Sequence, residues 1–496
     1  MKPSTRNTTR NTVRRTNSHS PAPLPPTETT QAEDTLLEQA KHCYREYGIY
    51  TIEQRAIPDF RDGLKPVQRK ALWAMFKLNL KPSGKQVKSA RVVGEIIGKY
   101  SPHGDQSAYQ AMVNMAGTKA KGASAASPWF TKNTPEPLIW GFGNWGSAEK
   151  EAAAYRYSEC KLSQYAADFL LDPEYLRVMD YLPNFDDTTE EPVLLPAKLP
   201  NVLLNGAQGI SVGITTSIPS FARKGVIECA KLAIAQTLTD KDIIKHLKPS
   251  YAYGGHWDSK ELANVISGTQ NYLTVSAQPE LCSDNAIRVR SLPPNMRLSR
   301  LIQILESLDG TASVADETGP DGFCVTAKPK RMSPNDRIKW YEQATKRLVS
   351  KDRVTLNLTQ RHPDGSVTFS PMSLLDIFTR WADWRVEIER KVISLRLHEN
   401  ALQLHKLQLL LKAAINPDAL ASALKAKDAS AYLQKHLSVS SDDANWLLEQ
   451  PLKRFRSLER KELQASIAAH EKKDRALQSQ LKAPRKGILD EMHGWR

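Results

Sequence analysis

The sequence predicts a multidomain α+β protein. Its 496 residues can form roughly two to four hydrophobic cores. Apolar residues recur at helical spacing from residue 36 to about residue 117, and short β-branched stretches separated by glycine and proline follow between residues 196 and 371. After Pro371 an apolar residue returns at every seventh position, which is typical of long helices that pair as a coiled coil.

The charge balance indicates a polyanionic partner. The formal net charge is +15 and the sequence pI is about 9.4, values typical of nucleic-acid-binding proteins, although a solvated basic surface would give the same values. The five cysteines are scattered without a Cys-x-x-Cys pair, so we expect reduced thiols in the cytoplasm and neither a disulfide framework nor a zinc site. No apolar run approaches the length of a membrane span.

Residues 1–33 are predicted to be a disordered basic tail. Their acidic residues are Glu28 and Glu33, and the rest is mainly polar with several basic residues: Lys2, Arg6, Arg10, Arg14 and Arg15. Such a segment cannot bury enough apolar surface to fold. It could be a nonspecific DNA-binding arm or a solubilising tail. An organelle transit peptide is disfavoured because the segment has no clear amphipathic apolar face.

Residues 34–219 are predicted to begin with helices, placed over residues 67–80, 90–97 and 105–116. Pro66 suits the first turn of the first of these, and Asp105 is the expected N-cap of the last. Two short helices around a glycine-containing turn are typical of a helix-turn-helix unit, with an ordinary helical hairpin as the alternative. DNA binding is favoured by the basic residues around that turn: Lys88, Arg91, Lys99 and His103.

Residues 152–159, Ala-Ala-Ala-Tyr-Arg-Tyr-Ser-Glu, carry the candidate chemistry. A glycine-rich turn at residues 141–147 precedes them and allows close backbone approach. The phenol of Tyr157 can act as a nucleophile, and its attack on a phosphodiester would store the energy of the broken strand in a phosphotyrosyl ester. Arg156 could stabilise the charge on the phosphorus oxygens. The octapeptide alone also fits a buried tyrosine beside a solvated arginine.

The middle of the chain is predicted to mix strands and helices. A glycine-interrupted apolar run at residues 196–219 indicates a strand pair or bulged loop, in which core packing is the simplest role for Ile210. Between residues 220 and 371, strands are expected over residues 287–292 and 354–358. A basic cluster there could contact DNA or lie in a solvated turn: Lys328, Lys330 and Arg331.

Residues 372–482 are predicted to form a long coiled coil, or alternatively a helical bundle packed on the body. The apolar position that recurs at every seventh residue is occupied by Leu374, Trp381, Ile388, Leu395, Leu402 and Leu409. The partner helix is expected within residues 452–481, and a compact helical knob within residues 416–450. Residues 483–496 are expected to be a C-terminal tail.

Several long motifs occur in a fixed order. They are Arg55-Ala-Ile-Pro-Asp-Phe-Arg-Asp-Gly-Leu-Lys-Pro-Val-Gln-Arg69, Lys88-Ser-Ala-Arg-Val-Val-Gly-Glu-Ile-Ile-Gly-Lys-Tyr-Ser-Pro-His-Gly-Asp105, Gly-Asn-Trp-Gly-Ser and Ala-Ala-Ala-Tyr-Arg-Tyr. In this order they resemble the breakage–reunion subunit of type IIA DNA topoisomerases, which is the A subunit of gyrase and its topoisomerase IV and bacteriophage relatives. The resemblance runs from about residue 36 to about residue 481 and is strongest over residues 55–219.

The resemblance implies a specific architecture. Residues 34–219 would form a winged-helix DNA-binding domain of the catabolite-activator type, with the tyrosine on the wing side. Residues 220–371 would form an α/β tower along which bent DNA lies. Residues 372–482 would form a long antiparallel coiled coil, capped at residues 416–450 by a helical dimerisation globule, the C-gate.

The resemblance also implies roles for single residues. Tyr157 would become linked to the 5′ end of the cut strand, and Arg156 would stabilise the transition state. Ile210 would be inserted between base pairs as an apolar wedge, which costs about a few kcal/mol per step. With Lys88 added from the basic flank, the residues expected to contact DNA are Arg55, Lys65, Arg69, Lys88, Arg91 and His103.

The expected cofactors are Mg²⁺ and ATP, both held by a partner. The sequence has neither an acidic Asp-x-Asp cluster with an upstream Glu nor a phosphate loop. The resemblance therefore implies a homodimer that joins a B-type subunit in an A₂B₂ assembly and acts on duplex DNA as an ATP-dependent type II topoisomerase. The chain ends at Arg496 without the C-terminal DNA-wrapping domain of gyrase, so relaxation or decatenation is expected, in the bacterial cytoplasm or in a phage-infected host.

Some positions depart from the family pattern, and two other functions compete. Ser101 stands where a histidine is usual, and Gln106 and Gln110 stand where quinolone-sensitive relatives have a serine and an acidic residue.

A tyrosine recombinase would need His-x-x-Arg upstream of the tyrosine. The matches at residues 42–45 and 493–496 are badly placed for that role. A catalytically silent architectural DNA-binding protein is the second alternative, against which the intact Arg-Tyr pair argues.

Overall fold

The computed structural model describes five stretches of the chain: residues 36–118, 136–146, 151–318, 323–451 and 460–495. The predicted basic tail over residues 1–33 lies outside them. The protein divides into two compact units, residues 1–49 and 50–496. Helix α1 (Leu36–Thr51) supplies the described part of the first unit and confirms that helical structure begins near residue 36.

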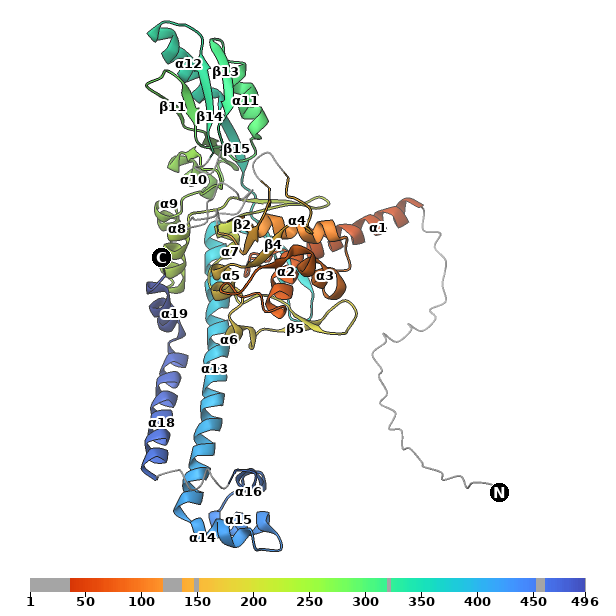
Figure 1. The fold of residues 1–496 in the computed structure, drawn as a ribbon, viewed down its shortest axis with the longest axis vertical. Coiled ribbons are helices and arrows are strands. Elements are labelled where there is room, and N and C mark those ends of the chain that lie inside the picture. The colour runs from red at the N-terminus through yellow and green to blue at the C-terminus, as the bar shows by residue number, and fades with distance from the viewer. Residues whose placement is uncertain (1–35, 119–135, 147–150, 319–322, 452–459, 496) are drawn as a thin grey trace, which may run out of the picture. The chain divides into compact units, whose positions relative to one another are not determined.

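The second unit opens with a π-helical turn, η1 (Ile52–Ala56), followed by α2 (Pro66–Lys77), α3 (Ser89–Lys99) and α4 (Asp105–Met115) (Figure 1). These three α-helices confirm the helices predicted there. They contact one another and pack their apolar faces into one core, in which the most deeply buried side chains include Leu72, Met75, Val92, Ile96 and Met112.

Two helix ends differ from the predictions. α2 stops at Lys77 and not near residue 80, because Asn79 adopts a left-handed conformation with φ 57°. The chain then turns, and the carbonyl of Leu80 accepts a hydrogen bond of 3.2 Å from Leu162 N–H. At α4, Gly104 is the N-cap in place of Asp105, which is the first helical residue and whose charge favours that end of the helix.

A four-stranded sheet in the order β1-β4-β3-β2 accompanies these helices. β4 (Glu159–Leu162) pairs antiparallel with β1 (Val87–Lys88) and β3 (Ile139–Phe142), and β3 pairs parallel with β2 (Ala116–Thr118). Alternate residues of β3 and β4 are buried, so one face of the sheet contributes to the core.

The same core also includes residues of helices α5 (Gln164–Phe169), α6 (Pro173–Leu176), α7 (Asn201–Asn205), α8 (Arg223–Ile234) and α9 (Asp240–His246). Two antiparallel hairpins accompany them: β5 (Tyr181–Pro183) with β6 (Glu190–Pro192), and β7 (Ala207–Ile210) with β8 (Thr215–Ile218). The second hairpin confirms the strand pair predicted over residues 196–219, whereas α7 in that run was not predicted.

A second core draws its buried side chains from residues 253–348. One sheet has the order β11-β12-β14-β13 and another the order β15-β10-β9. Apolar residues of α11 and α12, including Leu301, Leu305 and Trp340, are buried in this core. The elements of residues 256–353 are β9 (His256–Trp257), α10 (Ser259–Ile266), β10 (Tyr272–Ser276), β11 (Pro279–Leu281), β12 (Ile287–Val289), α11 (Leu298–Glu306), β13 (Thr311–Asp316), β14 (Val325–Pro329), α12 (Pro334–Arg347) and β15 (Val349–Arg353). Leu262 of α10 and Leu273 of β10 are buried in the first core and not in the second.

The predicted boundaries of this region change in two ways. The separate core begins near Tyr253 and not at residue 220, because the apolar face of α8 is buried in the first core and α8 contacts the long helix α13 (Leu374–Ile415). The strand predicted over residues 354–358 is wrong in its position, because β15 ends at Arg353 and only residues 357 and 358 lie in the next strand, β16 (Asn357–Arg361), which pairs with β17 (Val367–Pro371). Thr355 between them instead bridges Ser217 of β8.

α13 and α18 (Arg460–Lys482) lie side by side, as expected for a two-helix coil (Figure 1). The predicted seven-residue stripe does not hold along the whole of α13. Leu402 is 47% exposed, whereas Asn400 is 2% exposed and donates a hydrogen bond of 3.0 Å to the carbonyl of His470. An α-helix turns by about 20° per heptad relative to a strict seven-residue repeat, so the buried stripe drifts off the predicted positions.

The C-terminal segments complete two cores. The helices α14 (Pro417–Ala423), α15 (Ala429–Leu437) and α16 (Ser441–Leu448) share a small core with the end of α13, as predicted for residues 416–450. The predicted tail is wrong, because α19 (Pro484–His493) buries Ile488 and Met492 in the first core. Its Glu491 also accepts a hydrogen bond of 3.1 Å from the buried guanidinium of Arg385.

Candidate active site

The predicted nucleophile lies in a turn at residues 155–157 between the glycine-rich loop and β4. In that loop the indole of Trp145 covers Gly141, where a Cβ atom would lie only 2.6 Å from the indole nitrogen. The indole N–H donates to the carbonyl of Phe142 at 3.2 Å, and Ala153 N–H donates to the carbonyl of Asn144 at 3.0 Å. The absence of a side chain at residue 141 therefore allows a closely packed support for the turn.

Hydroxyl groups fasten the turn to α3 and α4. The Tyr109 hydroxyl lies 2.8 Å from both the carbonyl oxygen of Ala153 and Ser158 Oγ. Ser158 Oγ lies 2.8 Å from Ser89 Oγ, and Ser89 N–H donates to the Ser158 carbonyl at 3.0 Å. Ser89 and Ser158 are fully buried, so this network holds the backbone on both sides of Tyr157 without competition from water.

The two tyrosines of the turn have different environments. Tyr157 is 67% exposed, which excludes the alternative of a buried tyrosine at this position. The Arg156 guanidinium lies 4.8 Å from the centre of its ring, and hydrogen bonding to Arg156, together with that positive charge, lowers the pKa of the Tyr157 phenol. The Tyr155 hydroxyl instead donates to Asp105 Oδ2 at 2.7 Å, and this bond raises its pKa. The phenol of Tyr157 is therefore the more accessible of the two, and the one with the lowered pKa.

Four of the residues expected to contact DNA are exposed: Arg55, Lys88, Arg91 and His103. Lys88 lies opposite Glu159 in the β1–β4 pair, with its ammonium 3.0 Å from that carboxylate, so it is placed beside the turn that carries Tyr157. The Tyr50 hydroxyl lies 3.2 Å from Nε2 of His103. Ser101 is buried, and its N–H donates to the carbonyl of Ile96 at 2.8 Å.

Ile210 is displayed at the end of β7. Its side chain is 85% exposed, so core packing is wrong as its role in this chain. The hairpin below it is firmly supported, because Lys65 Nζ donates to the carbonyl of Gln208 at 2.6 Å. A Cβ atom on Gly209 would lie 2.1 Å from the carbonyl oxygen of Ala56, so the two backbones are in direct contact. Lys65 is partly buried, which lowers its pKa.

Arg69 departs from the expectation that it contacts DNA. It is only 5% exposed, and its guanidinium donates two hydrogen bonds, of 2.6 and 3.0 Å, to the carboxylate of Asp62. Asp62 is fully buried and also accepts a hydrogen bond of 3.1 Å from Leu195 N–H. The pair therefore joins the loop before α2 to a distant segment, and the charge of Arg69 is already compensated.

The sequence did not reveal a second buried ion pair in the same motif. Arg61 donates to the carboxylate of Asp59 at 2.9 and 2.8 Å, and Asp59 accepts a further hydrogen bond of 2.6 Å from Arg361 N–H. The acidic residues that lie between the arginines of residues 55–69 are the feature of the sequence from which these ion pairs could have been predicted. Gly63 has φ +67° and lies where a Cβ atom would be 2.2 Å from Val202 N. Much of the motif is therefore structural.

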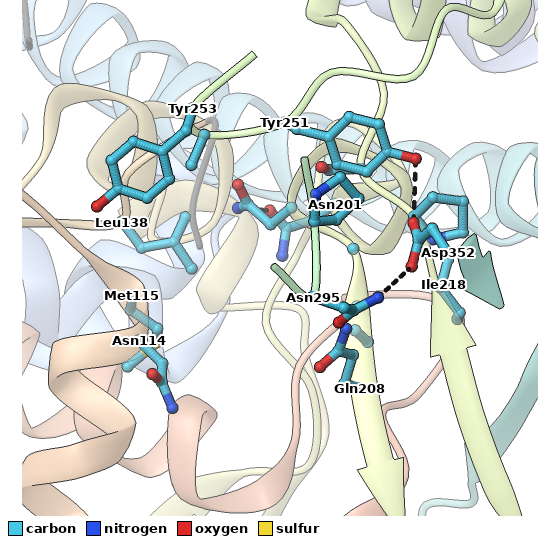
Figure 2. Close-up of a pocket in the computed structure, with 18 of the residues that line it drawn as sticks. Asn114, Met115, Leu138, Asn201, Gln208, Ile218, Tyr251, Tyr253, Asn295 and Asp352 are labelled. Atoms are coloured by element: carbon cyan, nitrogen blue, oxygen red, sulfur yellow. Dashed lines mark hydrogen bonds between the residues drawn. The ribbon is translucent and has the colours of Figure 1, made fainter. Parts of the chain in front are cut away.

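A cavity of about 560 Å³ adjoins the supported hairpin, with Lys65 and Gln208 in its lining (Figure 2). Asp352 is also in the lining and accepts hydrogen bonds from the Tyr251 hydroxyl at 3.0 Å and from Asn295 Nδ2 at 3.4 Å. Burial raises the pKa of this carboxyl group. The lining of the cavity thus includes both a basic residue and a buried acid.

The family resemblance implies Mg²⁺, so the available ligands matter. In the stretches that the structure describes, no group of three or more His, Cys, Asp or Glu side chains could hold a metal ion. Two carboxylates that contact the turn or its neighbouring strand are engaged, Glu159 with Lys88 and Asp105 with Tyr155. These residues do not fit a Mg²⁺ site.

In the stretches that the structure describes, none of the helices combines the length and the apolar character of a membrane span.

Comparison with known proteins identifies the family. A family model described as the A subunit of DNA gyrase/topoisomerase IV matches residues 55–492. The chain belongs to this family. It is 32% identical over 471 residues to the A subunit of DNA topoisomerase 4 from Salmonella typhimurium, covering 91% of this chain and 59% of the relative. The corresponding Escherichia coli K12 protein is 31% identical over 467 residues with the same coverage, and that of Synechocystis 31% over 495 residues, covering 92% and 52%.

Family membership confirms the resemblance found in the sequence and removes the basis for the tyrosine-recombinase alternative. The mixed helices and small sheets agree with the predicted α+β class. The chain spans somewhat more than half the length of the curated relatives that it matches, namely 59% of the Salmonella protein and 52% of the Synechocystis protein. The activity of a whole topoisomerase subunit is therefore a proposal for this chain.

Proposed function

We propose that this chain is the DNA-cleaving subunit of a type II topoisomerase. The Tyr157 oxygen attacks a backbone phosphorus, the bond from phosphorus to the 3′ oxygen breaks, and the 5′ phosphate becomes esterified to Tyr157. The free 3′ hydroxyl later attacks the same phosphorus and restores both the strand and the phenol. The carrying observation is an exposed phenol, with its pKa lowered by Arg156, on a turn that buried hydrogen bonds hold rigid.

The surrounding side chains take complementary roles in this proposal. Arg156 balances the charge that develops on the phosphorus oxygens. Ile210 acts as the wedge between base pairs, which its 85% exposure and rigid hairpin support. Arg69 is assigned to positioning the loop, because its guanidinium is bound to Asp62. The cations assigned to DNA phosphates are Arg55, Lys65, Lys88 and Arg91, and His103 is assigned to donate a hydrogen bond there.

The larger parts follow the same assignment. α2 to α4 with the four-stranded sheet serve as the winged-helix domain, the core of residues 253–348 serves as the tower, and the globule of α14 to α16 serves as the dimerising C-gate. By the family resemblance, Mg²⁺ and ATP are assigned to a B-type partner in an A₂B₂ assembly. Each of two subunits cuts one strand, and a second duplex passes through, which relaxes or decatenates DNA.

The proposal is tested with linked DNA circles. The holoenzyme, co-purified with its native B-type partner, is expected to unlink catenated circles with ATP and Mg²⁺. Stopping the reaction with detergent should leave protein attached to 5′ ends. Failure to form any covalent complex under these conditions would favour the catalytically silent architectural protein.

The chain without its partner is expected to bind duplex DNA with a steep salt dependence and to cut nothing. If it contacts about six to ten phosphates, its affinity should fall by about 10³–10⁵ between roughly 50 and 200 mM salt, because bound cations release counterions from DNA. Fluorescence anisotropy with a labelled duplex measures this slope. Efficient Mg²⁺-dependent cleavage by the isolated chain would contradict the assignment of the metal to the partner.

Resistance to quinolones is expected from Gln106 and Gln110 on α4. Both are exposed and lie one helical turn apart, so they share a face. By resemblance, these positions anchor the water shell of a drug-bound Mg²⁺, and glutamine brings no negative charge to a hydrated dication. Titrating a quinolone into the holoenzyme cleavage reaction should trap Gln106→Ser/Gln110→Glu at lower drug concentrations than the wild type. Equal trapping of both proteins would overturn the expectation.

A further inference from the structure

Tyr157 depends on its backbone for orientation. Its side chain is 67% exposed, and its ring contacts the guanidinium of Arg156, itself an exposed group. An exposed phenol has several rotamers, and a well-oriented attack requires reacting atoms about 3–3.5 Å apart. The position of the 155–157 turn on the body of the protein must therefore fix where the phenol can reach.

Within the turn itself, the side chain that bonds to the body of the protein is that of Tyr155. Its hydroxyl donates to Asp105 Oδ2 at 2.7 Å, and Asp105 is the first residue of α4. Hydrogen bonds to a charged group are stronger than neutral ones, and the helix N-terminus favours that charge. The same bond raises the pKa of Tyr155, which keeps its proton on the phenol.

Tyr109, which lies one helical turn after Asp105 on α4, contacts both Tyr155 and the backbone that flanks the turn. Its ring packs edge-to-face against Tyr155 at 5.7 Å between centroids. Its hydroxyl is 2.8 Å from both the carbonyl oxygen of Ala153 and Ser158 Oγ. The anchors thus fall at residues 153, 155 and 158, on both sides of the Arg156–Tyr157 pair, and all three are held by Asp105 or Tyr109 in the first turns of α4.

We propose that Tyr155 is a positioning residue for Tyr157. Its hydrogen bond to Asp105 sets the register between α4 and the turn that bears the nucleophile, so that α4 and the phenol meet the same DNA site together. The inference rests on the proposed function and adds a residue to it. It assigns to Asp105 the role of acceptor for Tyr155.

The expected effect is on the chemical step and not on DNA binding. Tyr155→Phe removes the hydroxyl but keeps the ring that packs on Tyr109. A misplacement of about 1 Å can cost about 10²-fold in rate, so we expect covalent-complex formation to slow by roughly 10- to 100-fold. The dissociation constant for duplex DNA should stay within about twofold, because no proposed phosphate contact is lost.

The test uses the holoenzyme with its native B-type partner and a short labelled duplex. Single-turnover cleavage gives the rate, anisotropy gives the dissociation constant, and thermal melting reports on folding. Tyr165→Phe is the matched control, since this buried hydroxyl has no hydrogen-bond partner within the described residues. Its removal should leave the rate, the affinity and the melting temperature close to those of the wild type.

A double-mutant cycle decides the mechanism. Tyr155→Phe and Asp105→Ala should slow cleavage to a similar extent, and the double variant should be no slower than the slower single variant, because both break one bond. Wild-type cleavage rates in Tyr155→Phe, or fully additive losses in the double variant, would overturn the inference. If the wild-type holoenzyme itself forms no covalent complex, the proposed function fails first, and the two failures are thereby distinguished.

Discussion

Tyr157→Phe is expected to abolish covalent attachment of the protein to DNA. The change removes only the phenolic oxygen, which is the proposed nucleophile, and leaves the neighbouring Arg156 in place. With no oxygen to attack phosphorus, protein-linked 5′ ends should fall below detection when a holoenzyme–DNA mixture is denatured with detergent. DNA affinity, measured by anisotropy at fixed salt, should remain within about twofold because the cations that contact phosphates are retained.

The control for this variant is Tyr155→Phe, which removes the neighbouring hydroxyl two residues away. That protein should still form protein-linked ends, although more slowly. Linked ends that persist at the wild-type level in Tyr157→Phe would show that another residue is the nucleophile. Loss of DNA binding in Tyr157→Phe would instead show that the phenolic hydroxyl contributes to DNA binding.

Asp62→Ala is expected to cause a large loss of stability in the first core. It would leave the guanidinium of Arg69, which is 5% exposed, without its counter-ion. It would also remove the acceptor of Leu195 N–H. Breaking a buried ion pair by removing one partner costs about 3–5 kcal/mol. We therefore expect a melting temperature lower by roughly 10 °C, measured by calorimetry or circular dichroism.

A surface ion pair supplies the comparison for Asp62→Ala. Glu387 is 61% exposed on its side chain and pairs with Lys391 at 3.3 Å on α13. Because exposed pairs of this spacing contribute about 0.3–0.5 kcal/mol, Glu387→Ala should melt within about 1–2 °C of the wild type. Equal shifts in the two variants would mean that Arg69 finds another partner or water when Asp62 is absent.

Local signals in the sequence predicted several elements well. Proline before residues 67–80 and glycine around the following helices placed α2, α3 and α4 within a few residues. Glycines within a β-branched run predicted a strand pair or a bulged loop, of which the structure shows the first, the hairpin of β7 and β8. These features are encoded by neighbouring residues, since turn conformation and helix caps depend on local backbone preferences.

Other predictions failed where distant segments decide the outcome. The heptad pattern placed Leu402 in the buried stripe, but this residue is exposed, because a helix of 42 residues drifts from a seven-residue repeat. Asn400 is buried instead and bonds to a residue of α18. The expected C-terminal tail became α19, whose apolar face is buried in a core formed largely by residues far earlier in the chain. Neither contact leaves a signal in the residues next to it.

The sequence by itself determined the family, the basic character of the chain and the identity of the Arg156–Tyr157 pair, because these depend on residue types in order. Only the tertiary structure separated two kinds of arginine in one motif. It exposes Arg55 but closes Arg69 onto Asp62, since burial and pairing depend on segments such as the one around Leu195 that lie far away in the sequence. It likewise left the phenol of Tyr157 exposed while tying that of Tyr155 to Asp105.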